Sequence, residues 1–222
     1  ETFRTKLYPE YKANRDEAPE DFGPQVERCL ELLRLMRIPV FGLEGVEADD
    51  TIASIITHCA SDHAELAIRI ASRDKDLTQL CSPRVDMFDA MKDALVTPSD
   101  VFKTEGVEPH MVGDILALMG DTADNIPGVP GIGPKTAAKL IIEHGDLNGL
   151  YEALPGLKGK KMQAIGEHRE TTALARQLVD LKRDLDTGFD LDDADFDPGQ
   201  IDLEGLDALC RQLGFNCLLY TS

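Results

Sequence analysis

Acidic residues form short groups at three places in the chain, each beside the expected end of a helix or strand. The groups lie at 47–50, 74–76 and 121–124. Carboxylate oxygens suit Mg²⁺, which completes its shell with water and with phosphate oxygens of a substrate. If folding brings the groups together, their charges resist ionisation unless cations lie among them. The predicted metal ligands are Glu47, Asp49, Asp50, Asp74, Asp76, Asp121 and Asp124.

The stretch after the third acidic group has the layout of a helix–hairpin–helix that binds a nucleic-acid phosphate. Glycines let the backbone approach a ligand closely. Pro134 suits a first helical position, and the free N–H groups there, with the helix dipole, favour an anion. The predicted DNA contacts of this turn are Gly128, Gly131, Gly133, Lys135 and Thr136. A metal site directly before a phosphate turn indicates phosphodiester hydrolysis.

Each acidic group also has a purely structural explanation. Carboxylates at 47–50 would be favoured by a helix dipole, and Asp74 could cap a short helix. The pair at 121–124 could belong to an ordinary loop between two helices. We find no Ser–His–Asp or Cys–His arrangement, and the five histidines lack ligand spacing. Two divalent ions ~4 Å apart would need no general base from the protein.

Composition narrows the class of protein. With 222 residues and 42% hydrophobic content, the chain can bury a core and form one large or two small domains. No apolar run approaches the ~20 residues of a membrane span. A net charge of -18 argues against binding nucleic acid through bulk positive charge, so basic surface must be local. Five scattered cysteines indicate neither zinc nor a disulfide framework, and we expect a reducing cytoplasm.

The apolar pattern predicts an α/β arrangement in which acids follow buried strands, where open sheets bind ligands. Strands are expected at 38–41, 66–71 and 85–88, and helices near 22–37, 48–59, 112–119, 162–168 and 172–183. The first 20 residues are basic and aromatic against the trend of the chain. Such a segment suits stacking on bases and contact with phosphates, or is a mobile, solvated arm.

Residues 8–15, 45–50, 74–77 and 120–136, in this order and spacing, resemble the flap endonuclease family, which includes the 5′-nuclease domain of bacterial DNA polymerase I. The resemblance covers the chain to about residue 215. It implies a PIN-like α/β core with a mostly parallel sheet at 1–118, followed by a helical helix–hairpin–helix subdomain at 119–216. We expect 217–222 to be read-through of a sequencing adaptor.

The resemblance also implies roles and partners. The seven acids would hold two Mg²⁺, with Mn²⁺ as an alternative, and main-chain carbonyls of the glycine turn would hold K⁺. Lys12 and Arg15 would engage the scissile phosphate as catalytic residues, with Tyr11 beside them on the DNA. The substrates would be DNA with 5′ flaps, nicks or RNA primers. The protein would be monomeric, continuous with polymerase domains, and located in the bacterial cytosol or nucleoid.

Two other functions remain open: a free-standing flap endonuclease, and a catalytically inactive module that binds branched DNA. The family carries two further metal-binding aspartates upstream of the position where this chain begins. We therefore expect the chain as written to cleave poorly. Arg73 stands where the family usually has a small residue, so it could contact substrate or offset the acids.

Overall fold

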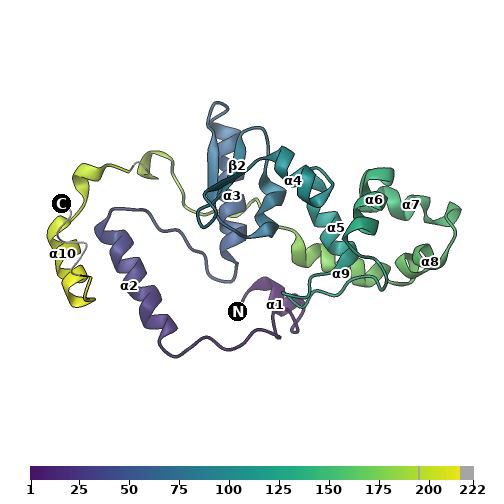
Figure 1. Ribbon diagram of the computed structural model, residues 1–222, viewed down its shortest axis with the longest axis horizontal. Helices are drawn as coiled ribbons and strands as arrows, with labels where there is room; N and C mark the ends of the chain where they lie inside the picture. Colours follow the sequence, from purple (N-terminus) through teal and green to yellow (C-terminus); the bar gives the residue numbers. More distant parts are fainter. Residues whose placement is uncertain (195, 216–222) are drawn as a thin grey trace. The chain divides into compact units, whose positions relative to one another are not determined.

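The computed structural model describes residues 1–194 and 196–215, and contacts divide them into two units. Unit 1 comprises Glu1–Arg15 and Glu44–Leu185. Unit 2 comprises Asp16–Leu43 and the described residues from 186 onward. The chain thus leaves unit 1 after Arg15 and returns to it at Glu44 (Figure 1).

Unit 1 contains a three-stranded sheet in the order β1-β2-β3. Strand β1, Ile68–Ala71, runs parallel to β2, Val85–Asp89, and β3, Ala94–Val96, returns antiparallel to β2. The first two strands confirm the prediction, whereas β3 is too short to give a periodic pattern. Because β1 and β2 are parallel, their carboxyl ends lie at one edge of the sheet.

Helices before and after the sheet complete the first part of unit 1. They are α1 (Phe3–Leu7), α3 (Ala48–Asp62), the 3₁₀ turn η1 (Lys75–Leu80), α4 (Pro98–Glu105), η2 (Pro109–Met111) and α5 (Val112–Met119). Helix α4 shows how the sequence sets such boundaries. Thr97 and Asp100 form a capping box at its start, and Gly106 ends it at φ 79°.

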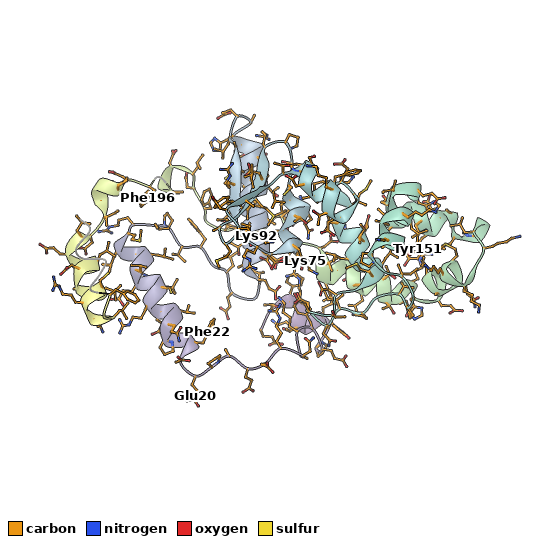
Figure 2. All side chains as sticks on the ribbon, viewed as in Figure 1. Glu20, Phe22, Lys75, Lys92, Tyr151 and Phe196 are labelled. Atoms are coloured by element: carbon orange, nitrogen blue, oxygen red, sulfur yellow. The ribbon has the colours of Figure 1, made fainter. Side chains whose placement is uncertain are left out.

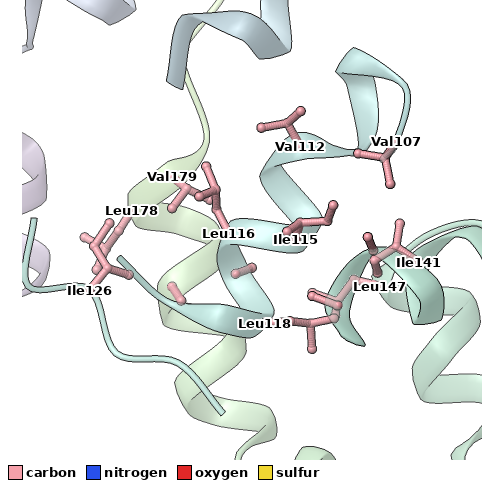
Figure 3. Close-up of a cluster of buried hydrophobic side chains, with 14 of the residues drawn as sticks. Val107, Val112, Ile115, Leu116, Leu118, Ile126, Ile141, Leu147, Leu178 and Val179 are labelled. Carbon is pink, nitrogen blue, oxygen red and sulfur yellow. The ribbon is translucent and has the colours of Figure 1, made fainter. Parts of the chain in front are cut away.

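The remaining helices of unit 1 are α6 (Pro134–His144), α7 (Leu147–Ala153), η3 (Leu154–Gly156), α8 (Lys160–Glu167) and α9 (Arg169–Val179). Of these, α6 and α9 pack against α5, and α7 packs against α6. Every residue of α5 from Val112 to Leu118 is buried, and Figure 3 shows its apolar side chains in the core. The one charged residue among them, Asp114, is paired with Arg176 at 2.9 Å. Helix α9 ends at Val179, earlier than predicted, because Asp180 is extended.

Unit 2 contains α2 (Phe22–Leu35), η4 (Asp192–Ala194), η5 (Pro198–Gln200) and α10 (Leu203–Gln212). The predicted strand at 38–41 is wrong, since these residues form no regular element. Pro39 has no N–H to donate, and no strand in the described part of this unit pairs with the segment. The Phe41 and Phe189 rings instead meet edge to face at 5.1 Å.

The cysteines in the described ranges are free: Cys29 is exposed, Cys59 and Cys81 are buried, and Cys210 is partly buried. Among the described residues, no helix is both long enough and apolar enough to span a bilayer. Cys217 and the predicted adaptor segment 217–222 lie outside the described residues.

Candidate metal centre

Six of the seven predicted ligands line one cavity of about 470 Å³ in unit 1. They come from the start of α3, the connection from β1 to η1, and the loop between α5 and α6. The acids are Glu47, Asp49, Asp74, Asp76, Asp121 and Asp124. Four cationic side chains line the same cavity: Arg4, Lys12, Arg15 and Lys75. The fold therefore brings together acids that are up to 77 positions apart (124 − 47).

Asp50 is the predicted ligand that does not line the cavity. Its carboxylate is fully buried and accepts two hydrogen bonds from the Arg4 guanidinium, at 2.6 and 2.8 Å. It also accepts the backbone N–H groups of Lys182 at 3.0 Å and Glu47 at 3.1 Å. Burial alone would raise the pKa of Asp50, but these donors outweigh it and the pKa lies below its usual value. Arg4 and the backbone engage both oxygens of Asp50, which favours a structural role, and its role as a metal ligand stays a prediction.

Asp74 and Asp76 are positioned by the turn after β1. The Asp74 side chain caps η1 by accepting the Asp76 N–H at 3.0 Å. The Asp76 Oδ1 atom is buried and has no hydrogen-bond partner among the described residues. Burial, followed by the charge of Asp74, raises the pKa of Asp76 to about 6. A buried carboxylate oxygen without a donor is costly unless a cation reaches it.

Asp121 and Asp124 lie on a tight loop between α5 and α6. The loop is closed by two backbone bonds between Asp121 and Ile126, at 2.9 and 2.7 Å. Asp121 accepts the Ala123 N–H at 2.7 Å and the Lys75 ammonium at 2.6 Å. Burial opposes the charged form of Asp121, but the Lys75 hydrogen bond and charge, together with the backbone N–H donors of Ala123 and Asp124, outweigh it and lower the pKa. Asp121 therefore stays ionised beside its own ammonium partner.

The N-terminal segment is built into this centre and is not a mobile arm. Lys12 Nζ lies 2.8 Å from Glu47 and 3.6 Å from Asp124, and Arg15 Nη2 lies 2.5 Å from Asp124. The Tyr11 hydroxyl donates to Glu47 at 3.0 Å and lies 3.2 Å from Asp124. Tyr11 is only 5% exposed and its ring is part of the core. Its contact with DNA stays a prediction.

The acids are not gathered around a single point as they stand. In the described ranges, no three His, Cys, Asp or Glu side chains are arranged to hold one metal ion. The ion pairs explain this arrangement, since Lys12, Arg15 and Lys75 each engage an acid of the cavity. The fourth cation, Arg4, is balanced by Asp50, so six acids against the other three cations leave three carboxylates uncompensated (6 − 3). Hard oxygen donors with surplus negative charge suit a divalent ion of the magnesium type.

The predicted phosphate turn forms between the acidic loop and α6. Val129 N–H donates to the Leu118 carbonyl at 2.8 Å, and α6 begins at Pro134 after Gly133, without a side-chain cap. Gly131 has a φ of 77°, which favours glycine. A Cβ on Gly128 would lie 2.1 Å from the Met119 carbonyl oxygen, so this glycine is required by the chain's own packing.

Basic side chains are exposed around the turn. Lys135 is exposed, and Thr136 accepts a hydrogen bond from Lys161 at 3.1 Å, which ties the start of α8 to the start of α6. The start of α6 thus carries the exposed ammonium group of Lys135 and has that of Lys161 at its side.

Two side chains of the centre were not predicted. Lys75 stands between two predicted ligands in the sequence Asp-Lys-Asp. This position next to the predicted ligands could have marked Lys75 as part of the site. Arg4 gave no such signal, because its partner Asp50 is 46 residues away. Only the fold brings these two together.

Two family models together match residues 1–202. One, the N-terminal resolvase-like domain of 5′-3′ exonucleases, matches 1–107, and the other, their C-terminal SAM fold, matches 107–202. The chain therefore belongs to the 5′-3′ exonuclease family.

The curated relatives include DNA polymerase I of Rhizobium leguminosarum, 43% identical over 192 residues, or 86% of this chain and 19% of the relative. DNA polymerase I of Bacillus caldotenax is 38% identical over 224 residues, or 98% of this chain and 25% of the relative. The chain thus spans about a fifth to a quarter of the length of these relatives.

Solved structures agree with this assignment. A 5′-exonuclease mutant of T5 is similar with a TM-score of 0.69 and 27% identity, covering 95% of this chain and 78% of that chain. A bacteriophage T5 flap endonuclease in a pseudo-enzyme-product complex with DNA and metal ions gives the same values. The catalytic core of Rad2 with DNA substrate, at 17% identity, covers 93% of this chain and 68% of that chain with a TM-score of 0.57 and shares the fold.

Proposed function

We propose that this chain is the metal-dependent 5′-nuclease part of a bacterial DNA polymerase I, which hydrolyses phosphodiesters at 5′ ends and flaps of DNA or of RNA primers. The observation that carries the proposal is the single cavity that holds six carboxylates and three cations paired to them. We keep 1–118 as the catalytic core and 119–216 as the DNA-binding subdomain. Further polymerase domains and a cytosolic location are proposed from the bacterial relatives.

The proposed ligands of two Mg²⁺, or Mn²⁺, are the six acids of the cavity, without Asp50. The unpartnered buried oxygen of Asp76 and the surplus negative charge both fit a divalent cation. Relatives support this assignment, because T5 5′-exonuclease has been solved with zinc and T5 flap endonuclease with metal ions. Bound divalent ions supply activation of water and neutralisation of phosphate charge.

The chain's own residues bind and orient the substrate. Lys12 and Arg15, now paired with Glu47 and Asp124, are placed to exchange these carboxylates for the oxygens of an entering phosphate. An arginine binds phosphate through two parallel hydrogen bonds, which fixes its orientation. Tyr11 holds Glu47 and Asp124 from the buried side, so the ligands keep their spacing while the cations move. No side-chain nucleophile is needed.

The glycine turn is proposed to grip the duplex backbone. The side chains of Lys135 and Thr136 at the start of α6 provide donors for a phosphate. A K⁺ ion held by main-chain carbonyls is proposed for the same turn. This grip is independent of sequence and loses strength as salt is added.

Cleavage of a 5′-flap duplex tests the proposal, in this chain and in the complete gene product. Asp121→Asn in the complete product should lower the Mg²⁺-dependent cleavage rate by about 100-fold or more, because it removes a ligand charge. Asp86→Asn, an exposed strand acid outside the cavity, is the matched control and should leave the rate unchanged. Equal rates for Asp121→Asn and the parent protein would overturn the nuclease proposal.

One observation favours a second candidate, an inactive module that binds branched DNA. No metal-binding group of three acids stands ready-made in the described residues. That function predicts flap binding that is the same in Mg²⁺ and in EDTA, with no cleavage by the complete product.

A further inference from the structure

A second cavity, of about 250 Å³, adjoins the carboxylate cavity in unit 1. The two cavities share Asp74 and Lys75 in their linings. The second one lies where β1 and β2 end, and its wall includes Arg73, Asp89 and Lys92. Because β1 and β2 are parallel, the residues after β1 meet the last residue of β2 at one sheet edge.

Asp89 anchors two cations at this edge. It is 7% exposed, and its Oδ1 accepts the N–H groups of Met91 at 3.0 Å and Lys92 at 3.3 Å. These bonds fix the turn between β2 and β3. Arg73 Nε lies 3.7 Å from Asp89 Oδ1 and Lys92 Nζ lies 3.6 Å from Oδ2. The single carboxylate of Asp89 is therefore shared between the positive charges of Arg73 and Lys92.

The two cations keep donors that face solvent. The Arg73 side chain is 63% exposed and the Lys92 side chain 74%. Within the part of the chain that the structure describes, the Arg73 side chain makes no hydrogen bond, and Asp89 is its ion-pair partner. Figure 2 labels Lys75 and Lys92, which line this second cavity together. The cavity is lined by three cations and by three acids, Asp74, Asp89 and Glu105. Lys75 is already paired with Asp121 at 2.6 Å, so Arg73 and Lys92 are the cations that remain available to a ligand.

We propose that Arg73 and Lys92 form a subsite for a backbone phosphate of the DNA, neighbouring the phosphate that enters the carboxylate cavity. The inference rests on the proposed function, because it places a strand across the carboxylate cavity. The shared wall of Asp74 and Lys75 makes the two cavities neighbours along such a strand. The contact recognises the sugar–phosphate backbone and not the bases.

Salt dependence of flap binding tests the subsite against a matched control. The matched control is Arg69, which lies on β1 and pairs with Asp86 on β2. Arg69→Gln and Arg73→Gln each remove one positive charge, at positions four residues apart (73 − 69). Binding of a fluorescent 5′-flap duplex is measured in EDTA from 50 to 400 mM KCl. Arg73→Gln should weaken binding about three- to eightfold near 100 mM salt and reduce the salt slope by about 0.9. Arg69→Gln should change neither.

Neutral phosphates locate the contact. A set of flaps is prepared in which one methylphosphonate replaces a phosphate at successive positions. The affinity of each flap is measured for the parent protein, for Arg73→Gln and for Lys92→Gln. A methylphosphonate at one position near the scissile bond should lower the affinity of the parent protein but should not lower the affinity of Arg73→Gln any further. Such non-additive losses identify coupled groups in a double-mutant cycle. Thermal unfolding of each variant verifies that it is folded.

The outcomes separate the two proposals. Equal losses for Arg69→Gln and Arg73→Gln, or no methylphosphonate position that couples to Arg73, would overturn the subsite while flap binding by the parent stands. Failure of the parent protein to prefer a flap over an unbranched duplex would remove the proposed function itself.

Discussion

The Arg4 guanidinium and the Asp50 carboxylate form a bidentate pair, at 2.6 and 2.8 Å, in which both side chains are buried. Arg4 also donates to the carbonyls of Leu178 at 2.7 Å and Asp180 at 2.9 Å. The pair therefore connects α1, the start of α3 and the end of α9, and it supports the wall from which Glu47 and Asp49 face the cavity.

Removal of one partner of this pair should be strongly destabilising. Asp50→Ala would leave the Arg4 charge buried without its carboxylate, which costs about 3–5 kcal/mol of unfolding free energy. Asp86→Ala, which breaks the exposed Arg69–Asp86 pair, should cost about 1 kcal/mol or less. Urea unfolding monitored by circular dichroism gives both values. Similar losses for the two variants would show that the buried pair is not a major support.

Divalent ions should stabilise the folded chain through Asp76. At ten times the Kd, a ligand adds about 1.4 kcal/mol, which raises Tm by about 3–6 °C in a chain of this size. Asp76→Asn should melt higher than the parent in EDTA, because its buried unpartnered oxygen no longer carries charge. Asp76→Asn should also lose most of the rise in Tm that 10 mM MgCl₂ gives the parent protein. An unchanged Mg²⁺ shift in Asp76→Asn would exclude Asp76 as a ligand, and Asp86→Asn serves as the control.

Two glycines of the phosphate turn should respond differently to alanine. Gly128→Ala places a methyl group against the Met119 carbonyl, and we expect a loss of about 3 kcal/mol or more. Gly131 has open space around it, so Gly131→Ala should cost only about 1–2 kcal/mol, from its φ of 77°. Chemical unfolding of both variants measures the difference. A larger loss for Gly131→Ala would contradict this description of the turn.

Alkylation should depend on pH differently for buried and exposed thiols. Burial raises the pKa of Cys81 to about 11, so its reactive thiolate is scarce at pH 8 and increases only as the pH approaches that value. The folded state retains this proton, so its stabilisation is complete below the unfolded pKa of about 8.5 and is lost as the pH rises through 11. Iodoacetamide at pH 8 should modify exposed Cys29 first, as followed by peptide mass spectrometry. Equal labelling rates in the folded chain would contradict the burial of Cys81.

The sequence predicted the parts of the centre that depend on local order. Asp74 and Asp76 follow a strand, and Asp121 and Asp124 precede a glycine turn, so element boundaries alone marked them. The role of Asp50 could not be predicted in this way. Its spacing from Glu47 fits a shared helix face, but the distant Arg4 determines that it is buried.

Long-range pairing also explains the errors in the fold. Residues 38–41 are apolar enough for a strand, but a strand needs a neighbour, and Pro39 lacks a donor. Strand β3 is only three residues long and exists because the turn fixed by Asp89 returns the chain alongside β2. Neither outcome follows from hydrophobic periodicity.

Lys12, Arg15 and Lys75 have a practical consequence for handling the protein. Because these side chains already neutralise half of the acids in the cavity, removing the metal leaves only the other three carboxylates without a counter-charge, which weakens the fold but does not unfold it. The complete product should therefore stay folded after treatment with a chelator, and dialysis into buffer that contains Mg²⁺ should restore its cleavage activity. Removal of the metal should thus abolish activity without unfolding the protein. Metal-free samples should then bind the DNA substrate without cleaving it.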